Sequence, residues 1–330
     1  MKTLTASAPG KLVLCGEYAV LDGAPAISAA VDRRAVVTIR TADADVVVSR
    51  GFRDGRHRFA ARDGRVEWRS GDAALPLFEA CWAAVPATGE PVDVSLDTTA
   101  FHAGDRKLGL GSSAALTVAL VAALTTWQGR GRDVGPVAAA AHREFQGGAG
   151  SGVDVATSVA GGLIRFTTGG EREPLAWPPG LEAAILWSGI SASTRDRLAR
   201  LERAGSLPSR PALATAADAA AAAWTDGEAG AVIAATREFV VALRAFSDDH
   251  GLDVFAAGHA GLAELAEREG LVYKPCGAGG GDIGIVLGDT AERVAGFAET
   301  AAAAGFSQLP LELSTPNHSI AGLTVAWTQD

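Results

Sequence analysis

The chain has 330 residues, of which 48% are hydrophobic and 20% charged, so it can bury a large core and is long enough for two domains. This composition excludes intrinsic disorder as the dominant state. The net charge of -9 argues against nucleic acid or an anionic membrane surface as the main ligand, although a few local cations and backbone N–H groups suffice for a small anionic substrate.

The cysteines and the N-terminus indicate a cytoplasmic protein. Cys15, Cys81 and Cys276 are odd in number and lack a C-x-x-C spacing, so we expect neither a disulfide framework nor a zinc site. The first residues lack the apolar stretch of a secretion signal, and no window approaches the ~18 to 20 apolar residues of a membrane span. We therefore expect no nucleic-acid and no membrane partner.

The front section of the chain predicts a sheet with one inserted helix. Short runs rich in β-branched residues are separated by Asp-Gly turns at 53–55 and 62–64, a pattern typical of strands. The expected strands are Leu12–Cys15, Ala35–Arg40, Asp45–Ser49, Arg65–Trp68 and Val92–Leu96, and the expected helix lies around Ala73–Ala84.

The pattern then becomes helical and returns to alternation near the end. Mixed elements without a regular βαβ period favour an α+β fold. A boundary near Pro178–Leu181 divides the chain into residues 1–180 and 181–330. We expect helices at Ser112–Trp127, Val134–Phe145, Gly152–Val159 and Ala291–Ala304, helical sequence over Thr194–Gly270 with breaks at Pro208–Pro211, Asp226–Gly227 and His250–Gly251, and strands at Leu163–Thr167, Ala183–Trp187, Leu271–Lys274, Ile283–Leu287 and twice more at the end.

Many of the 40 glycines fall in four short segments. In the first, Lys11 follows a Pro-Gly turn and enters an apolar strand, where a lone ammonium is unfavourable without an anionic partner; an ordinary hairpin with a solvated Lys11 is the alternative. In the second, Gly109–Ser113, two glycines and two serines begin a long apolar helix. Helix N-terminal N–H groups bind anions and a Ser hydroxyl can ligate Mg²⁺, whereas a plain Ser N-cap leaves the Gly-x-Gly unexplained.

The other two segments lie later in the chain. Gly277–Gly281 contains four glycines in five residues between two expected strands, which suits a loop pressed against a ligand; a flexible surface loop is the alternative. Asp154 follows Gly152 at the start of a short helix, a position that the helix dipole alone also favours.

In this order and spacing, the four segments resemble the galactokinase, homoserine kinase, mevalonate kinase and phosphomevalonate kinase (GHMP) superfamily. Gly109–Ala115 matches its phosphate-binding motif without a change. The resemblance implies a nucleotide-binding N-terminal domain like the second domain of ribosomal protein S5, a ferredoxin-like C-terminal domain, and ATP with Mg²⁺ bound between them.

The resemblance also implies roles for individual residues. Lys11 and Asp154 would be catalytic, and Ser113 would ligate Mg²⁺. Mevalonate kinases of this superfamily place a Mg²⁺-binding Glu upstream of the aspartate. His142 stands at that position here, and Glu144, two residues on, is the candidate metal ligand. The ATP phosphates would be bound by Gly109, Leu110, Gly111, Ser112, Ser113 and Ala114.

Within the superfamily, Tyr18 and Asp282 look most like the branch that acts on 5-phosphomevalonate. The resemblance implies ATP-dependent phosphorylation of 5-phosphomevalonate to the diphosphate by a monomer or homodimer; mevalonate kinase, another small-molecule kinase and a non-catalytic ligand sensor are the alternatives. An anionic acceptor needs further cations, for which Arg195 is the first candidate, followed by Arg143 and Lys107. The implied substrate-binding residues are Glu17, Tyr18, Ser151, Gly152, Ser193, Thr194, Arg195, Gly277, Ala278, Gly279, Gly280 and Asp282.

Overall fold

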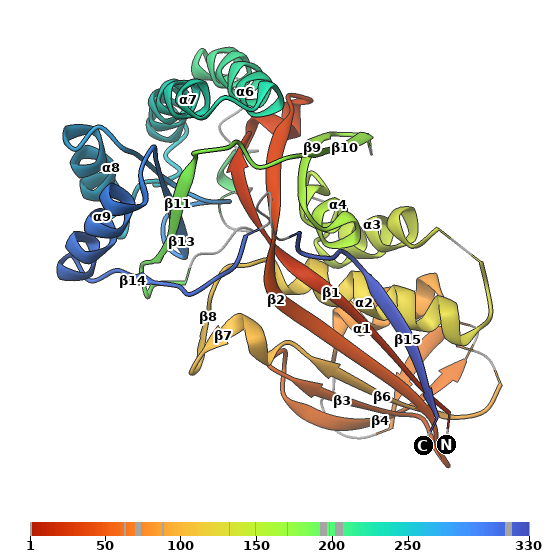
Figure 1. Ribbon diagram of the computed structural model, residues 1–330. Helices are drawn as coiled ribbons and strands as arrows, with labels where there is room; N and C mark the ends of the chain where they lie inside the picture. Colours follow the sequence, from red (N-terminus) through yellow and green to blue (C-terminus); the bar gives the residue numbers. More distant parts are fainter. Residues whose placement is uncertain are drawn as a thin grey trace.

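The computed structural model has the expected α+β architecture, with two principal sheets and helices packed on each (Figure 1). No helix in the described part of the chain is long and apolar enough to cross a membrane. The structure describes residues 2–62, 64–69, 74–87, 89–131, 133–148, 150–169, 171–191, 197, 199–201, 207–313 and 319–329.

The larger sheet is built around a long antiparallel pair, β1 and β2. The ladder between them shifts register at Pro9/Gly10, because proline has no N–H to donate. Just after this shift the N–H of Lys11 donates to the Leu110 carbonyl at 2.9 Å, which ties β1 to the segment before the long helix. The strands of this sheet are β1 (Lys2–Cys15), β2 (Ala26–Thr41), β3 (Val46–Arg50), β4 (Gly55–Arg62), β5 (Arg65–Trp68), β6 (Val92–Asp97), β9 (Leu163–Thr167), β10 (Glu171–Leu175) and β15 (Thr324–Gln329).

One helix forms the centre of this half. α2 (Ser112–Trp127) is apolar on all sides and almost wholly buried, as expected of a core helix. It contacts β1 and β2 on one side and the other three helices of this half around it (Figure 1). These are α1 (Pro76–Ala84), α3 (Val134–Phe145) and α4 (Val153–Ala160).

The smaller sheet is antiparallel, in the order β12-β13-β11-β14. α8 and α9 pack beside its strands, and α6 reaches the β1–β2 end of the larger sheet (Figure 1). Its strands are β11 (Glu182–Trp187), β12 (Val272–Pro275), β13 (Ile283–Gly288) and β14 (Ser307–Gln308), and the helices are α6 (Ser209–Asp226), α7 (Ala229–Asp249), α8 (His259–Arg268) and α9 (Ala291–Ala303). Short elements are η1 (Ala19–Asp22), η2 (Thr99–Phe101), β7 (His102–Ala103) and β8 (Arg106–Lys107).

Most predicted elements are confirmed within one or two residues, and the differences have local causes. Strands β4 and β10 were not expected, because both are rich in charged residues and lie at or next to the sheet edges. β1 starts ten residues before the predicted Leu12–Cys15, and β2 starts nine residues before the predicted Ala35–Arg40. The break expected at Pro208–Pro211 is present at its start, since Pro208 is the N-cap of α6, but the helix begins at Ser209 and holds Pro211 in its first turn, where a missing N–H leaves no bond unmade.

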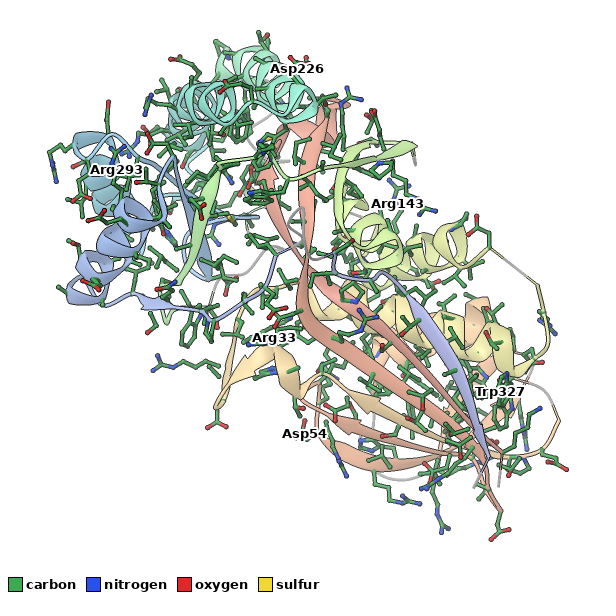
Figure 2. The ribbon with its side chains drawn as sticks, viewed as in Figure 1. Arg33, Asp54, Arg143, Asp226, Arg293 and Trp327 are labelled. Carbon is green, nitrogen blue, oxygen red and sulfur yellow. The ribbon has the colours of Figure 1, made fainter. Side chains whose placement is uncertain are left out.

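The last strand crosses the expected domain division. β15 pairs with β1, so the end of the chain lies in the larger sheet beside the start, and the two termini are neighbours (Figure 1). Trp327 of β15 stacks on Trp127 at 5.6 Å between ring centroids, and the Lys2 ammonium lies 4.1 Å from the Trp327 ring (Figure 2). The division into 1–180 and 181–330 stays a prediction, and β15, although it belongs to the second range, pairs with a strand of the first.

A buried polar pair lies in the core of the smaller half. His259, at the start of α8, has no exposed surface, and its Nδ1 lies 2.7 Å from the Tyr273 hydroxyl of β12. Its Nε2 lies 3.1 Å from the Gly281 carbonyl oxygen. Burial lowers the pKa of His259 to about 4, opposed by the bond to Gly281 and helped by the positive charges of Arg197 and Lys274.

This shift predicts a specific loss of stability in acid. Above pH 6.5, His259 is neutral in both the folded and the unfolded chain and adds no pH dependence. As the pH falls from 6.5 toward 4, the unfolded chain binds a proton that the folded protein excludes, which lowers the free energy of unfolding by roughly 3 kcal/mol in total. Urea unfolding at pH 7.5, 5.5 and 4.5 should show that the free energy of unfolding falls less steeply with decreasing pH in His259→Gln than in the wild type. The difference in slope should correspond to at most one proton; equal slopes would contradict the low pKa of His259.

Candidate active site

A small pocket of about 130 Å³ brings three distant parts of the sequence together. They are the end of β1 with the turn after it, the start of α4 with the residues before it, and the glycine-rich loop between β12 and β13. The pocket thus unites seven of the residues predicted from sequence: Lys11, Glu17, Tyr18, Ser151, Asp154, Gly277 and Ala278.

The two glycines before α2 make room for charged side chains. A Cβ on Gly111 would lie 3.1 Å from Cε of Lys11, and a Cβ on Gly109 would lie 2.6 Å from Cβ of Asp282. Both glycines have positive φ, and Gly111 is the N-cap of α2 without a side chain to occupy the helix N–H groups. The Gly-x-Gly segment therefore leaves the N-terminus of α2 open to an anion beside Lys11.

His142 connects the phosphate-binding segment with Asp154. Its ring is buried, with Nε2 3.2 Å from the Ser113 hydroxyl and Nδ1 3.8 Å from Asp154 Oδ2. Ser113 and Asp154 thus share one imidazole, although they lie on different helices. Glu144 is exposed on α3 and is not brought to them, because two residues along a helix turn a side chain to another face.

The oxygen atoms present fit Mg²⁺ only in the company of a phosphate ligand. Mg²⁺ prefers oxygen and in nucleotide sites is held by one or two side chains together with phosphate oxygens and water. Ser113 and Asp154 supply a hydroxyl and a carboxylate on either side of His142. Within the described residues there is no group of three His, Cys, Asp or Glu side chains that could hold a metal without other ligands.

A fully buried ion pair joins the two sheets behind the pocket. Lys274 of β12 has no exposed surface, and its ammonium contacts Glu17 Oε1, with the Val13 carbonyl at 3.4 Å. Burial lowers the pKa of Lys274, but the Cys276 sulfur and the Glu17 carboxylate raise it above its ordinary value. Glu17 Oε1 also accepts the Gly277 N–H at 3.4 Å, so the pair holds the start of the glycine-rich loop.

The rest of this loop is fastened by backbone contacts. The Tyr18 hydroxyl donates to the Ala278 carbonyl at 2.6 Å, and the Gly280 N–H donates to Val254 at 2.7 Å. Asp282 has a φ of 53°, and its N–H donates to Ile190 at 2.6 Å. The predicted alternative of a flexible surface loop therefore does not describe Gly277–Gly281.

Cations approach the pocket from two further segments. Desolvation lowers the pKa of Lys107, while the Asp282 carboxylate opposes this shift and Lys11 adds to it, which puts Lys107 in electrostatic reach of both. Arg197 donates from Nε to the Leu252 carbonyl at 3.1 Å, and its Nη2 fills the space that a Cβ on Gly280 would need. Arg143 is exposed on α3 (Figure 2).

Several functional assignments depend on positions that sequence reasoning did not single out or could not test. The sequence patterns do not single out Arg197, two residues after the predicted Arg195, and they include Lys274 only as the end of an expected strand. Ser193, Thr194 and Arg195 lie outside the described residues. Gly152 is the N-cap of α4, and Gly279 packs on Val254.

Comparison with known proteins shows the family of the chain. The family model of the GHMP kinases N terminal domain matches residues 77–162. A phosphomevalonate kinase of Streptomyces sp. (strain CL190) is 32% identical over 87% of this chain and 90% of its own length. The chain belongs to the GHMP kinase family.

Two further relatives of this GHMP kinase match a shorter stretch of the chain or match it at lower identity. A mevalonate kinase of Methanothermobacter thermautotrophicus is 39% identical over 48% of this chain and 49% of its own length. The phosphomevalonate kinase of Streptococcus pneumoniae, solved in complex with phosphomevalonate and AMPPNP, superposes with a TM-score of 0.80 at 19% identity, over 94% of this chain and 99% of the other. The predicted GHMP kinase fold is confirmed.

The buried pair predicts an asymmetric response to substitution. Lys274→Met leaves the Glu17 carboxylate buried without its counter-charge, so we expect the free energy of unfolding to fall by about 3–5 kcal/mol. Asp289→Asn, which removes an exposed pair with Arg293 on α9, is the matched control and should change it by less than about 1 kcal/mol. Denaturant unfolding of both variants tests this, and similar losses would show that the buried pair has no special weight.

Proposed function

We propose that this GHMP kinase transfers the γ-phosphoryl group of ATP to the phosphate of 5-phosphomevalonate, forming the 5-diphosphate and ADP. The observation that carries the proposal is the pocket in which Lys11 and Asp154 face the Tyr18–Ala278 contact beside the start of α2. The full-length relative named phosphomevalonate kinase supports the choice of acceptor. The mevalonate kinase relatives, which match about half to two thirds of the chain, support the alternative acceptor, mevalonate.

The nucleotide would bind with its phosphates at the N-terminus of α2. The N–H groups of residues 111–114 and the helix dipole would hold them, and Gly109 and Gly111 leave room for close approach. Ser113 would hold Mg²⁺ together with the phosphates, while the His142 ring lies between the Ser113 hydroxyl and the Asp154 carboxylate. When bound, Mg²⁺ would neutralise charge on the β- and γ-phosphates.

The acceptor decides what Asp154 has to do. A phosphate monoester has a second pKa of about 6 and is mostly a dianion at pH 7, so its attacking oxygen needs no general base. A hydroxyl acceptor such as mevalonate would need one. The carboxylate of Asp154 contacts His142 at 3.8 Å and lines the pocket with Lys11, which suits a group that shapes the site.

Lys11 would reduce the electrostatic repulsion between the two anionic substrates of the reaction. An oxygen of the acceptor phosphate forms a bond to the γ-phosphorus while the bond to the β-phosphate oxygen breaks and ADP leaves, so two anions must approach each other. Lys11 Nζ lies close to Gly277 on the acceptor side, and the Lys11 stem crosses Gly111 on the nucleotide side. Its ammonium would screen this repulsion, and Arg197 at Gly280 supplies a second cation at the acceptor loop.

The setting of the enzyme remains as predicted from its sequence. We place it in the cytoplasm as a monomer or homodimer whose partner is the small-molecule substrate, without nucleic acid or membrane. The three buried, unpaired cysteines and the negative net charge support this proposal.

The acceptor assignment predicts the order of substrate activities. In a coupled ADP-release assay with ATP and Mg²⁺, 5-phosphomevalonate should be turned over at least a hundredfold more efficiently than mevalonate, and homoserine should be inactive. Turnover of mevalonate but not of its phosphate would refute the assignment. Binding of ATP without turnover of any acceptor would favour a ligand sensor.

The roles of the two catalytic residues predict different variants. Lys11→Ala should lower kcat by about 10²- to 10³-fold, because a cation that stabilises the transition state is lost. Asp154→Asn, which keeps an oxygen and the shape of the side chain, should lower kcat only about tenfold and leave the pH profile of kcat as in the wild type. An equal loss in both variants, with an altered pH profile for Asp154→Asn, would restore a general-base role.

A further inference from the structure

The end of the glycine-rich loop is fastened from inside the protein by a polar relay that lies outside the pocket. We propose that His259 and Tyr273 are positioning residues for phosphoryl transfer, which hold the Gly281 carbonyl in place and thereby set Asp282 against Gly109. This inference rests on the proposed function and adds a positioning device to it.

The hydrogen positions in the relay follow from its chemistry. The Gly281 carbonyl can only accept, so the Nε2 of His259 carries the proton and donates to it at 3.1 Å. The Nδ1 of a neutral His259 is then an acceptor, and the Tyr273 hydroxyl donates to it at 2.7 Å. Burial raises the pKa of Tyr273 well above its usual value, which keeps the hydroxyl protonated as this direction requires.

The sequence makes room for the relay at Gly284. A Cβ on this residue would overlap the Tyr273 hydroxyl, although Gly284 lies inside strand β13, where glycine is normally unfavourable. Tyr273 and His259 are also packed ring to ring, with centroids 5.9 Å apart and planes 20° apart. The hydroxyl, the imidazole and the carbonyl therefore form one buried chain with a single direction.

The relay acts on the site through one residue. Asp282 follows Gly281 directly and has a φ of 53°. Its backbone N–H donates to the Ile190 carbonyl, and its backbone carbonyl accepts the Ser188 N–H at 2.9 Å. Its side chain occupies the space beside Gly109. Because a displacement of about 1 Å at a reacting centre can reduce the rate a hundredfold, loosening of the Gly281 carbonyl is expected to reach catalysis.

The test compares kinetics with the mobility of the loop in the full-length protein. Tyr273→Phe keeps the ring but removes the donor to His259, so Nδ1 is left buried without its hydrogen bond and the imidazole is held only through Gly281. We expect kcat/KM for 5-phosphomevalonate to fall three- to tenfold, mostly in kcat, and amide hydrogen exchange over 277–282 to accelerate by a similar factor. His259→Gln should give the same two changes and serves if Tyr273→Phe fails to fold.

A matched control separates positioning from general loss of packing. Trp177→Phe removes one buried hydrogen bond, from Nε1 to the Leu181 carbonyl, at a position outside the glycine-rich loop. It should lower the thermal midpoint but leave both readouts unchanged. Wild-type kinetics and exchange in Tyr273→Phe, or equal changes in Trp177→Phe, would overturn the proposal. If the wild type does not use 5-phosphomevalonate, the proposed function fails, while the exchange measurement still decides whether the relay holds the loop.

Discussion

The site depends on the buried charge of Lys274. An ammonium without exposed surface requires a partner, and Glu17 supplies it from the turn after β1, so the pair determines how the end of β1 faces β12. The same carboxylate accepts the Gly277 N–H. One electrostatic requirement therefore links β12 to the end of β1 and places the first residue of the glycine-rich loop beside Lys11.

The glycines around the pocket serve close approach more than flexibility. Lys11 and Asp282 cross the backbone at Gly111 and Gly109, and Arg197 does so at Gly280. The crossing at Gly111 brings the Lys11 cation to the N-terminus of α2, where backbone N–H groups can bind an anion. An acidic protein can thus create a local site for anionic ligands, because the local arrangement of cations and N–H groups outweighs its net charge.

The contacts of His142 could not be predicted from the sequence alone. Its position in the chain suggested a substituted metal ligand, with Glu144 as the nearby carboxylate, and gave no sign that the ring reaches Ser113 and Asp154 together. That contact requires α2, α3 and α4 to pack in one particular arrangement. The relay of His259 and Tyr273 escaped sequence reasoning for the same reason, since neither residue belongs to a motif.

The sequence by itself determined the α+β class, most element boundaries and the segments that line the pocket, because helix periodicity, strand alternation and glycine motifs are local properties. Local patterns singled out Lys11 and the Gly109–Ser113 segment as candidates, and the resemblance to the GHMP family added Asp154. Strands such as β4 and β10, the return of β15 to β1, and the partners of Lys274 were decided only by the tertiary structure. These features depend on cross-strand bonding, burial and charge pairing between residues up to hundreds of positions apart, which no local pattern encodes.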